Sequence, residues 1–267
     1  MTDRPSLPIM GPAFGANLSF VDLLRHERPE ALAQLHATVT AEAVAQIPHG
    51  TTVLGLKYAD GVIVAGDRRA TSGYTVAEDR MRKVFPADDY SAIAIAGVAG
   101  MAIEMVKLFQ LELEHYEKLT GDRLSLEGKA NRLAQLIRQN FPLAMQGLVV
   151  VPLFGGYDER RAEGRLFYYD ATGGRWEEDD YQATGSGSQP AKNSLKKRWK
   201  PGLARADAVK VAAEALLDAS EDDVATGGPN PNRHIYPTML AVTVDGADEI
   251  AEDEVAAAVA TVLEERS

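Results

Sequence analysis

The stretch that decides the fold is HGTTVLGLKYADGVIVAGDRRAT, residues 49–71. Its first part, TTVLGLKY, is rich in β-branched residues, which is typical of a strand. A second apolar run, VIVAGD, follows after Ala-Asp-Gly, a turn of the kind that joins antiparallel strands. The stretch therefore predicts a β-hairpin, and it places the start of a folded domain about fifty residues into the chain.

Further strands and helices follow this hairpin. The apolar run YSAIAIAGVAG, residues 90–100, is typical of a strand buried on both faces. Residues 101–120 have helical periodicity, with Val106, Phe109, Leu113 and Tyr116 expected on one face. Similar patterns predict strands within residues 146–158, 164–174, 175–188 and 235–246, and helices over residues 126–140, 189–198, 206–219 and 252–265. This order indicates two packed sheets covered by helices, an α+β fold.

Residues 1–50 differ from the rest of the chain, because prolines and glycines interrupt them repeatedly. Two short helices are expected, one over residues 20–25 capped by Ser19 and one over residues 30–45 opened by Pro29. Their apolar stripe is thin. The segment could dock on a partner, but it cannot form a core alone.

Composition narrows the function classes. The 267 residues suffice for one sizeable domain, and a net charge of −11 argues against a nucleic-acid-binding protein. The lack of cysteine excludes disulfides, thiolate zinc sites and a cysteine nucleophile. The five histidines lack metal-ligand spacing, and no apolar run is long enough for a membrane span. Because the N-terminus also lacks a secretory signal, we expect a cytoplasmic protein. The lack of cysteine and the scattered histidines suit a reaction that needs no metal or cofactor.

The Gly50-Thr51 junction suggests a specific chemistry. A threonine hydroxyl is a poor nucleophile unless a base lies beside it, and an N-terminal amine on the same residue can be that base. An α-amine has a pKa of about 7.7–8.0, so much of it is neutral near physiological pH. Cleavage after Gly50 would create base and nucleophile on Thr51 and would release the unusual first segment. The alternative is that Thr51 and Thr52 are ordinary β-branched strand residues.

Three other features bear on this hypothesis, although each also has an ordinary explanation. Asp67 follows a buried strand, so it either enters solvent or must be paired. Lys83 is either a surface residue or a cation, held by Asp67, that lowers the proton affinity of a nearby hydroxyl and amine. Gly97 and Gly100 either pack at a helix start or let backbone approach a ligand, where a free N–H could serve an oxyanion.

In their order and spacing, these motifs resemble a known family. HGTTVLGLKYADGVIVAGDRRAT, RKVF, IAGVAG, ATGSGS and DDVATGG are similar to segments of the β-type subunits of the proteasome core particle in their actinobacterial form. The resemblance runs from Thr51 to the C-terminus. It implies the four-layer αββα sandwich of N-terminal nucleophile hydrolases. It also implies a propeptide, residues 1–50, removed by autocleavage between Gly50 and Thr51, and a threonine endopeptidase domain, residues 51–267.

The resemblance assigns roles to the residues of the site. Thr51 is the expected nucleophile, and Asp67 and Lys83 are its charged support. The N–H of Gly97 is expected to stabilise the oxyanion, and Ser186 to hydrogen-bond near the Thr51 amine.

The motif DDVATGG adds two residues to this set. Asp223 is expected to orient Ser186 and the amine, and its neighbour Asp222 is the alternative for that role. Thr226 stands where the family commonly has a serine, so the hydroxyl is kept and a methyl group is added.

The family binds its substrate as an extended peptide, which implies hydrogen bonds to the backbone of Thr71, Gly97 and Ala99. The pocket beside the nucleophile is expected to be apolar and to favour cleavage after large apolar residues, as in chymotrypsin-like specificity. Its expected lining is Ala70, Met81, Ile95, Ala99 and Ile103. Plain core packing is the alternative for Met81, Ile95 and Ile103.

The resemblance also implies partners. Family members form stacked seven-membered rings of β-type copies and α-type subunits, fed through the α rings by an ATPase ring with proteins tagged by a prokaryotic ubiquitin-like modifier. Residues 1–50 would assist assembly or keep Thr51 blocked until the rings meet. Three alternatives stay open: a non-catalytic subunit that only builds the barrel, a simpler bacterial ring peptidase driven by its own ATPase, and an amidohydrolase with an N-terminal threonine.

Overall fold

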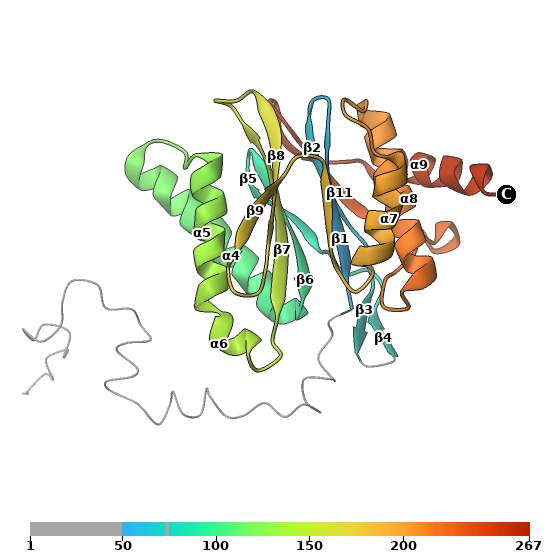
Figure 1. The fold of residues 1–267 in the computed structure, drawn as a ribbon, viewed down its shortest axis with the longest axis horizontal. Helices are drawn as coiled ribbons and strands as arrows, with labels where there is room; N and C mark the ends of the chain where they lie inside the picture. The colour runs from blue at the N-terminus through green and yellow to red at the C-terminus, as the bar shows by residue number, and fades with distance from the viewer. Residues whose placement is uncertain (1–49, 73–74) are drawn as a thin grey trace, which may run out of the picture. The chain divides into compact units, whose positions relative to one another are not determined.

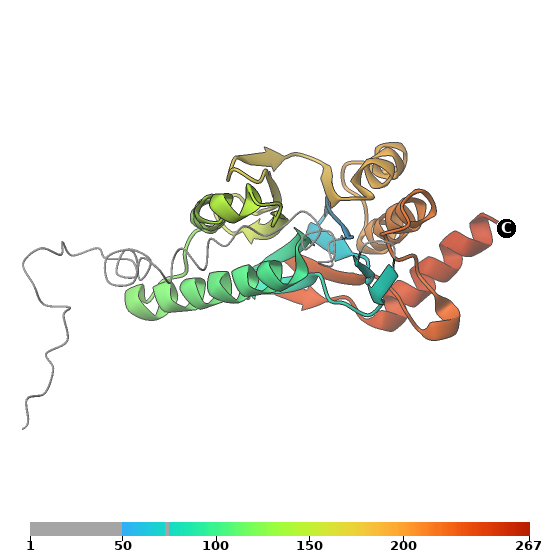
Figure 2. The same cartoon turned by 90° about the horizontal axis from the view of Figure 1, so that it is seen from below.

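The computed structural model describes residues 50–72 and 75–267, which form four layers (Figure 1). Two five-stranded antiparallel sheets lie at the centre, and helices cover the outer face of each sheet. Figure 2 shows the two groups of helices on opposite sides of the paired sheets. The predicted αββα sandwich is therefore confirmed. The helices expected over residues 20–25 and 30–45 lie outside the described residues.

The first sheet has the strand order β10-β1-β2-β11-β12. Its predicted opening hairpin is confirmed, because β1 and β2 pair from Val53 opposite Gly66 to Tyr58 opposite Gly61. All six residues of β2 and six of the seven in β1 are buried, which explains their apolar composition. The strands are β1 Thr52–Tyr58, β2 Gly61–Gly66, β10 Tyr181–Gly185, β11 Thr238–Thr243 and β12 Gly246–Glu249.

The second sheet has the strand order β5-β6-β7-β8-β9. Its central strand pair, β6 with β7, aligns Ser91 with Gly156 and Gly97 with Val150. A separate two-stranded ribbon, β3 Ala70–Ser72 with β4 Thr75–Glu78, follows the first hairpin. The strands of the second sheet are β5 Val84–Asp88, β6 Ser91–Gly97, β7 Val150–Asp158, β8 Glu163–Tyr169 and β9 Arg175–Glu178.

The helices lie close to their predicted positions. On the second sheet, α4 covers Ala99–Thr120 and α5 covers Leu126–Gln139, followed by the short α6, Phe141–Ala144. The remaining helices are α7 Ser188–Arg198, α8 Arg205–Asp222, the 3-10 turn η2 Pro231–Arg233 and α9 Glu252–Glu265. Each long helix predicted from the sequence is present within three residues of its expected ends, and none of those in the described part of the chain can cross a membrane.

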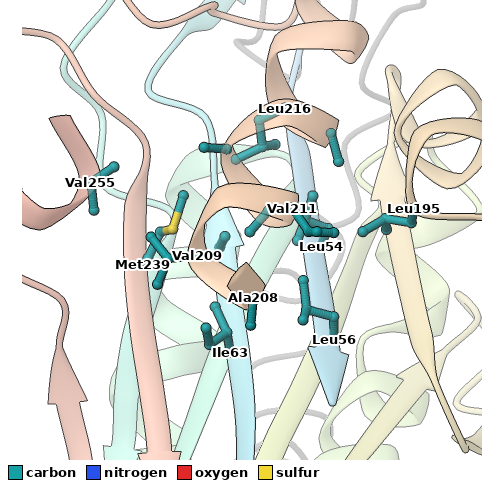
Figure 3. Packing of buried hydrophobic residues seen from close by; sticks show 14 of the residues in the cluster. Leu54, Leu56, Ile63, Leu195, Ala208, Val209, Val211, Leu216, Met239 and Val255 are labelled. Carbon is teal, nitrogen blue, oxygen red and sulfur yellow. The ribbon is translucent and has the colours of Figure 1, made fainter. Parts of the chain in front are cut away.

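Three apolar clusters hold the layers together. In the first, Leu54 and Ile63 of the first sheet pack against Val211 and Leu216 of α8, as Figure 3 shows. The second fills the space between the sheets and includes Val53 of β1, from the opposite face of that strand. The third joins the second sheet to α4 and α5. Because successive residues of a strand point to opposite faces, a strand such as β1 contributes to two clusters.

One detail of the predicted apolar face of α4 is wrong. Val106, Phe109 and Leu113 are buried as expected, but Tyr116 is 41% exposed. Every residue from 114 to 120 is exposed, so the last turns of the helix extend past the surface that the rest of α4 covers. Helical periodicity continues beyond the point where the sheet stops, which the sequence alone does not reveal.

Candidate active site

The candidate site lies where strands from both sheets begin or end. Thr51 directly precedes β1, and Asp67 directly follows β2. Lys83 directly precedes β5, Gly97 is the last residue of β6, and Ser186 directly follows β10. Because β1 runs antiparallel to both β2 and β10, its start lies beside the ends of those two strands. Residues far apart in the chain are therefore brought to one edge of the sandwich.

The site contains a buried ion pair. The Nζ of Lys83 lies 2.6 Å from Oδ1 of Asp67, and both side chains are about 1% exposed or less. Asp67 also accepts three backbone N–H groups, from Thr52 at 2.8 Å, Arg69 at 2.9 Å and Gly227 at 2.8 Å. These hydrogen bonds offset the free-energy cost of removing the carboxylate from water. Neither residue is a solvent-exposed surface group, so the ordinary explanations of Asp67 and Lys83 are wrong.

Lys83 is directed towards the Gly50-Thr51 junction. Its Nζ donates a short hydrogen bond to the carbonyl oxygen of Arg69 and lies 3.5 Å from the carbonyl oxygen of Gly50. Burial lowers the pKa of Lys83 below its ordinary value of 10.5, and the attraction of Asp67 opposes that shift. An ammonium with a lowered pKa, held beside a carbonyl oxygen, can stabilise negative charge there and can also exchange a proton.

Thr51 contacts its own junction and the loop after β10. Its Oγ1 donates to the Gly50 carbonyl oxygen at 2.6 Å, and its backbone N–H lies 3.4 Å from Oγ of Ser186. The backbone N–H of Ser186 donates to the carbonyl oxygen of Thr51 at 2.9 Å. Thr51 is 4% exposed in this continuous chain. The sequence-predicted pair of Thr51 and Ser186 is thus brought together.

Asp223, and not its neighbour Asp222, faces this group. Its Oδ2 accepts the hydroxyl hydrogens of Ser186 and Thr226, each at 2.6 Å, and its Oδ1 accepts the N–H of Ala225 at 3.1 Å. Asp222 is the exposed last residue of α8. Because Ser186 has one hydroxyl hydrogen and its bond to Asp223 is much shorter than the 3.3 Å to the Thr51 carbonyl oxygen, its oxygen is free to accept from the Thr51 nitrogen.

Gly97 has a backbone conformation that favours glycine. Its φ is +114°, and an added Cβ would lie 2.0 Å from the carbonyl oxygen of Val149. The N–H of Ile95 donates to the carbonyl oxygen of Lys83, and the N–H of Val98 donates to the carbonyl oxygen of Val149. Because alternate N–H groups of a strand share one edge, the N–H of Gly97 points to the same side as that of Ile95, beyond Lys83. Gly100 differs, since an added Cβ there would meet no atom within 4 Å, and close approach of a ligand to its backbone stays a prediction.

The predicted substrate-binding residues have unequal exposure. Ala70 and Thr71 are both buried at the start of β3, and the Thr71 hydroxyl lies close to Gly50. Met81, Ala99 and Ile103 are half-buried. Ile95 is 2% exposed and packs in the cluster between the second sheet and its helices. Ile103 packs against the same cluster. A pocket lined by these residues stays a prediction.

Two residues that connect this group are not apparent from the sequence. Thr52 bonds through its side chain to Thr226 and to the N–H of Gly187. Arg69 donates from its guanidinium to the carbonyl oxygens of Val224 at 2.9 Å and Thr226 at 3.3 Å. The charge of Arg69 at a strand end was a signal, but its partners lie more than 150 residues away in the chain, and no local pattern identifies them.

The described residues also limit the kinds of site present. Within residues 50–72 and 75–267, no three His, Cys, Asp or Glu side chains are grouped so that they could hold a metal ion. The expectation of a reaction without a metal or cofactor stays a prediction. What the arrangement offers instead is a hydroxyl bonded to the Gly50 carbonyl oxygen, an ammonium near that oxygen, and a hydrogen-bonded serine and carboxylate near the Thr51 nitrogen.

Comparison with known proteins agrees with this fold. A family model described as proteasome subunit matches residues 47–230. The chain is 50% identical over 248 residues to the proteasome subunit beta of Streptomyces griseus, which covers 93% of this chain and 88% of that protein. It is 47% identical over 266 residues to the proteasome subunit beta of Acidimicrobium ferrooxidans, covering 98% of this chain and 96% of that protein. The chain therefore belongs to the proteasome subunit family.

Proposed function

We propose that this chain is a catalytic β-type subunit of a proteasome core particle, a threonine endopeptidase with Thr51 as its nucleophile. The observation that carries the proposal is the position of the Thr51 hydroxyl. It lies 2.6 Å from the Gly50 carbonyl oxygen, which itself lies 3.5 Å from Nζ of Lys83, and the Thr51 nitrogen lies 3.4 Å from Oγ of Ser186. A subunit that only builds a barrel has no need for a buried ion pair aimed at this junction.

The first step of the proposal is self-cleavage after Gly50, which removes residues 1–50 and leaves residues 51–267. Oγ1 of Thr51 attacks the Gly50 carbonyl carbon, the C–N bond breaks, and the hydroxyl proton passes to the Thr51 nitrogen. Water then hydrolyses the resulting ester and frees the hydroxyl. Lys83, 3.5 Å from the Gly50 oxygen, would stabilise the negative charge that develops on that oxygen.

In the cleaved chain, the new amine of Thr51 replaces the external base that a hydroxyl nucleophile requires. The amine takes the Oγ1 proton, directly or through a water, while Oγ1 attacks a peptide carbonyl and forms an ester with the substrate. The amine gives that proton to the departing amino group. It then activates the water that releases the second product. Ser186 and Asp223 would fix the orientation of the amine, and Gly97 would donate its N–H to the oxyanion.

Gly50→Ala is expected to slow self-cleavage by at least about tenfold, because the Gly50-Thr51 peptide bond must be held in a precise position for the Thr51 hydroxyl to attack it. A Cβ at this position would lie 2.1 Å from Oγ1 of Thr71 and 2.6 Å from Cβ of Ala225, so the junction must shift. Mass spectrometry of the chain over time after assembly measures the effect. Gly100→Ala is the matched control, since it adds the same methyl group in open space. Cleavage of Gly50→Ala at the normal rate would contradict this placement of the junction.

The substrate preference follows from the apolar character of the proposed pocket. Fluorogenic peptides ending in Tyr are expected to be hydrolysed at least about tenfold faster than those ending in Arg or Glu, because an apolar pocket leaves a charge unpaired. Measuring kcat/KM for the three peptides with the assembled particle tests this. A preference for Arg would overturn the pocket assignment, which rests on Ala70, Met81, Ile95, Ala99 and Ile103.

The proposal includes partners as well. The two relatives are named as proteasome subunits, and a proteasome subunit works within an assembly. We infer stacked seven-membered rings with α-type subunits, supplied through the α rings by an ATPase ring with proteins that carry a prokaryotic ubiquitin-like modifier. Co-expression with the α-type subunit, followed by size measurement and degradation assays, tests each partner in turn. The cytoplasmic location expected from the sequence stays a prediction.

N-terminal sequencing of the purified assembly separates the proposal from a non-catalytic subunit. A mature chain that begins at Thr51 supports the peptidase. A chain that still begins near residue 1 after assembly supports the barrel-building alternative. The identity over most of two proteasome subunits beta favours a proteasome over the simpler ring peptidase or an amidohydrolase.

A further inference from the structure

Thr52, the residue after the proposed nucleophile, has its polar groups completely engaged. It is 0% exposed. Its backbone N–H donates to Oδ1 of Asp67 at 2.8 Å, and its carbonyl oxygen accepts the N–H of Asp67 at 3.1 Å. Its hydroxyl lies 2.6 Å from the hydroxyl of Thr226 and accepts the N–H of Gly187 at 2.9 Å. The backbone of this one residue thus contacts Asp67, while its side chain contacts the group around Asp223.

Counting hydrogens fixes the direction of the side-chain bonds. A carboxylate can only accept, so the short contact between Thr226 and Asp223 uses the single hydroxyl hydrogen of Thr226. The 2.6 Å contact between the two threonine hydroxyls must then use the hydrogen of Thr52. The bonds run in one direction from the Gly187 N–H, through Thr52 and Thr226, to Asp223. Hydrogen bonds in such a chain polarise one another, so the last bond gains from the first.

The space around these hydroxyls is tightly filled. A Cβ added at Gly187 would lie 2.6 Å from both the Thr52 and the Thr226 hydroxyl oxygens. Thr226 is itself 0% exposed. Because no gap is left between these groups, a loss of the Thr52 hydroxyl leaves the Gly187 N–H without its partner and the Thr226 oxygen without its donor.

We propose that Thr52 is a positioning residue for Thr51. The Thr52 hydroxyl fixes the positions of Thr226 and Asp223, and these in turn keep Ser186 within hydrogen-bond distance of the Thr51 nitrogen. This inference rests on the proposed function, since it concerns the amine that cleavage would create. Thr52 touches no reacting atom. Its effect is on the orientation of the amine, so it should alter the rate of the chemical step and leave peptide binding largely unchanged.

The test compares variants of the full chain assembled with its α-type partner. Thr52→Val keeps the shape of the side chain and removes the hydroxyl, and it is expected to lower kcat about tenfold or more, with KM changed by less than about twofold. Thr52→Ser restores the hydroxyl and should return kcat to within about threefold of the original chain. Thr243→Val is the matched control. Thr243 lies at the opposite end of the first sheet, where its hydroxyl oxygen accepts the N–H of Asp245. The kcat of the Thr243→Val particle should equal that of the original particle.

A double variant tests whether the two hydroxyls act in series. Thr52→Val combined with Thr226→Val should lose no more than about twofold beyond the worse single variant, since either change breaks the same chain. Losses that multiply would overturn the serial arrangement. A Thr52→Val particle with normal kcat, or a Thr52→Ser particle as slow as Thr52→Val, would overturn the inference while the peptidase assignment stands. An original particle that hydrolyses no peptide would overturn both.

Discussion

Thr51→Ala is expected to leave the chain at its full length and to abolish peptidase activity, with a loss of at least about a thousandfold. The hydroxyl that lies 2.6 Å from the Gly50 carbonyl oxygen is removed, so neither self-cleavage nor acyl transfer has a nucleophile. The fold should be unaffected, because Thr51 precedes β1 and its hydroxyl bonds only to the adjacent residue. Intact mass and hydrolysis of fluorogenic peptides by the assembled particle are the two measurements.

Thr51→Ser is the matched control for this variant. It keeps a hydroxyl and an amine-forming junction and loses only the methyl group, so it should still be cleaved and should retain measurable activity. A Thr51→Ala particle that hydrolyses peptides at the normal rate would show that another residue is the nucleophile. Full-length Thr51→Ala without activity, beside a cleaved and active Thr51→Ser, is the combination expected of an N-terminal threonine peptidase.

Much of the fold was predictable because local patterns and layer packing agree. The hairpin of β1 and β2 has β-branched strands and a short turn with glycine, and both strands are buried on two faces between a sheet and helices. The helix over Glu252–Glu265 was expected at the same bounds, since its apolar positions repeat until the chain leaves the core. Where a helix outlasts its contact surface, as α4 does at Tyr116, periodicity gives the wrong burial.

The site was predictable in its members more than in its connections. Thr51, Asp67, Lys83, Ser186 and Asp223 lie together, and the resemblance of motifs had grouped them. The bonds of Thr52 to Thr226 and of Arg69 to Val224 depend on packing between segments more than 150 residues apart. Ile95 packs in the helix-covered cluster, as alternation along β6 allows, and its place in the substrate pocket stays a prediction. Spacing along the chain cannot distinguish a residue that only packs in the core from one that also contacts the site.

Lys83→Met is expected to lower both the rate of self-cleavage and kcat by at least about a hundredfold. The variant preserves much of the side-chain volume but removes the ammonium that lies 3.5 Å from the Gly50 oxygen. It also leaves Asp67 buried without its cation, so some loss of stability is expected. Activity must therefore be compared per assembled particle, after confirming the melting temperature.

Lys129→Met is the matched control, because Lys129 is a second buried lysine, 2.5 Å from Asp88 and away from the junction. It should lose stability by up to about 3 kcal/mol, while kcat per assembled particle stays within about twofold of the original. Equal losses of kcat in the two variants would mean that Lys83 acts only through stability. A Lys83→Met particle with normal kcat would contradict the role given to the ammonium.

The pH dependence of kcat gives a second test of Lys83. Burial lowers its pKa below 10.5, so the ammonium loses its proton at a lower pH than an exposed lysine does. Because the protonated form supports the reaction, kcat should fall on the alkaline side with an apparent pKa below 10.5. The attraction of Asp67 raises the pKa of Lys83, so Asp67→Asn should move the remaining alkaline limb to still lower pH. A limb that moves to higher pH in Asp67→Asn would show that a group other than Lys83 titrates.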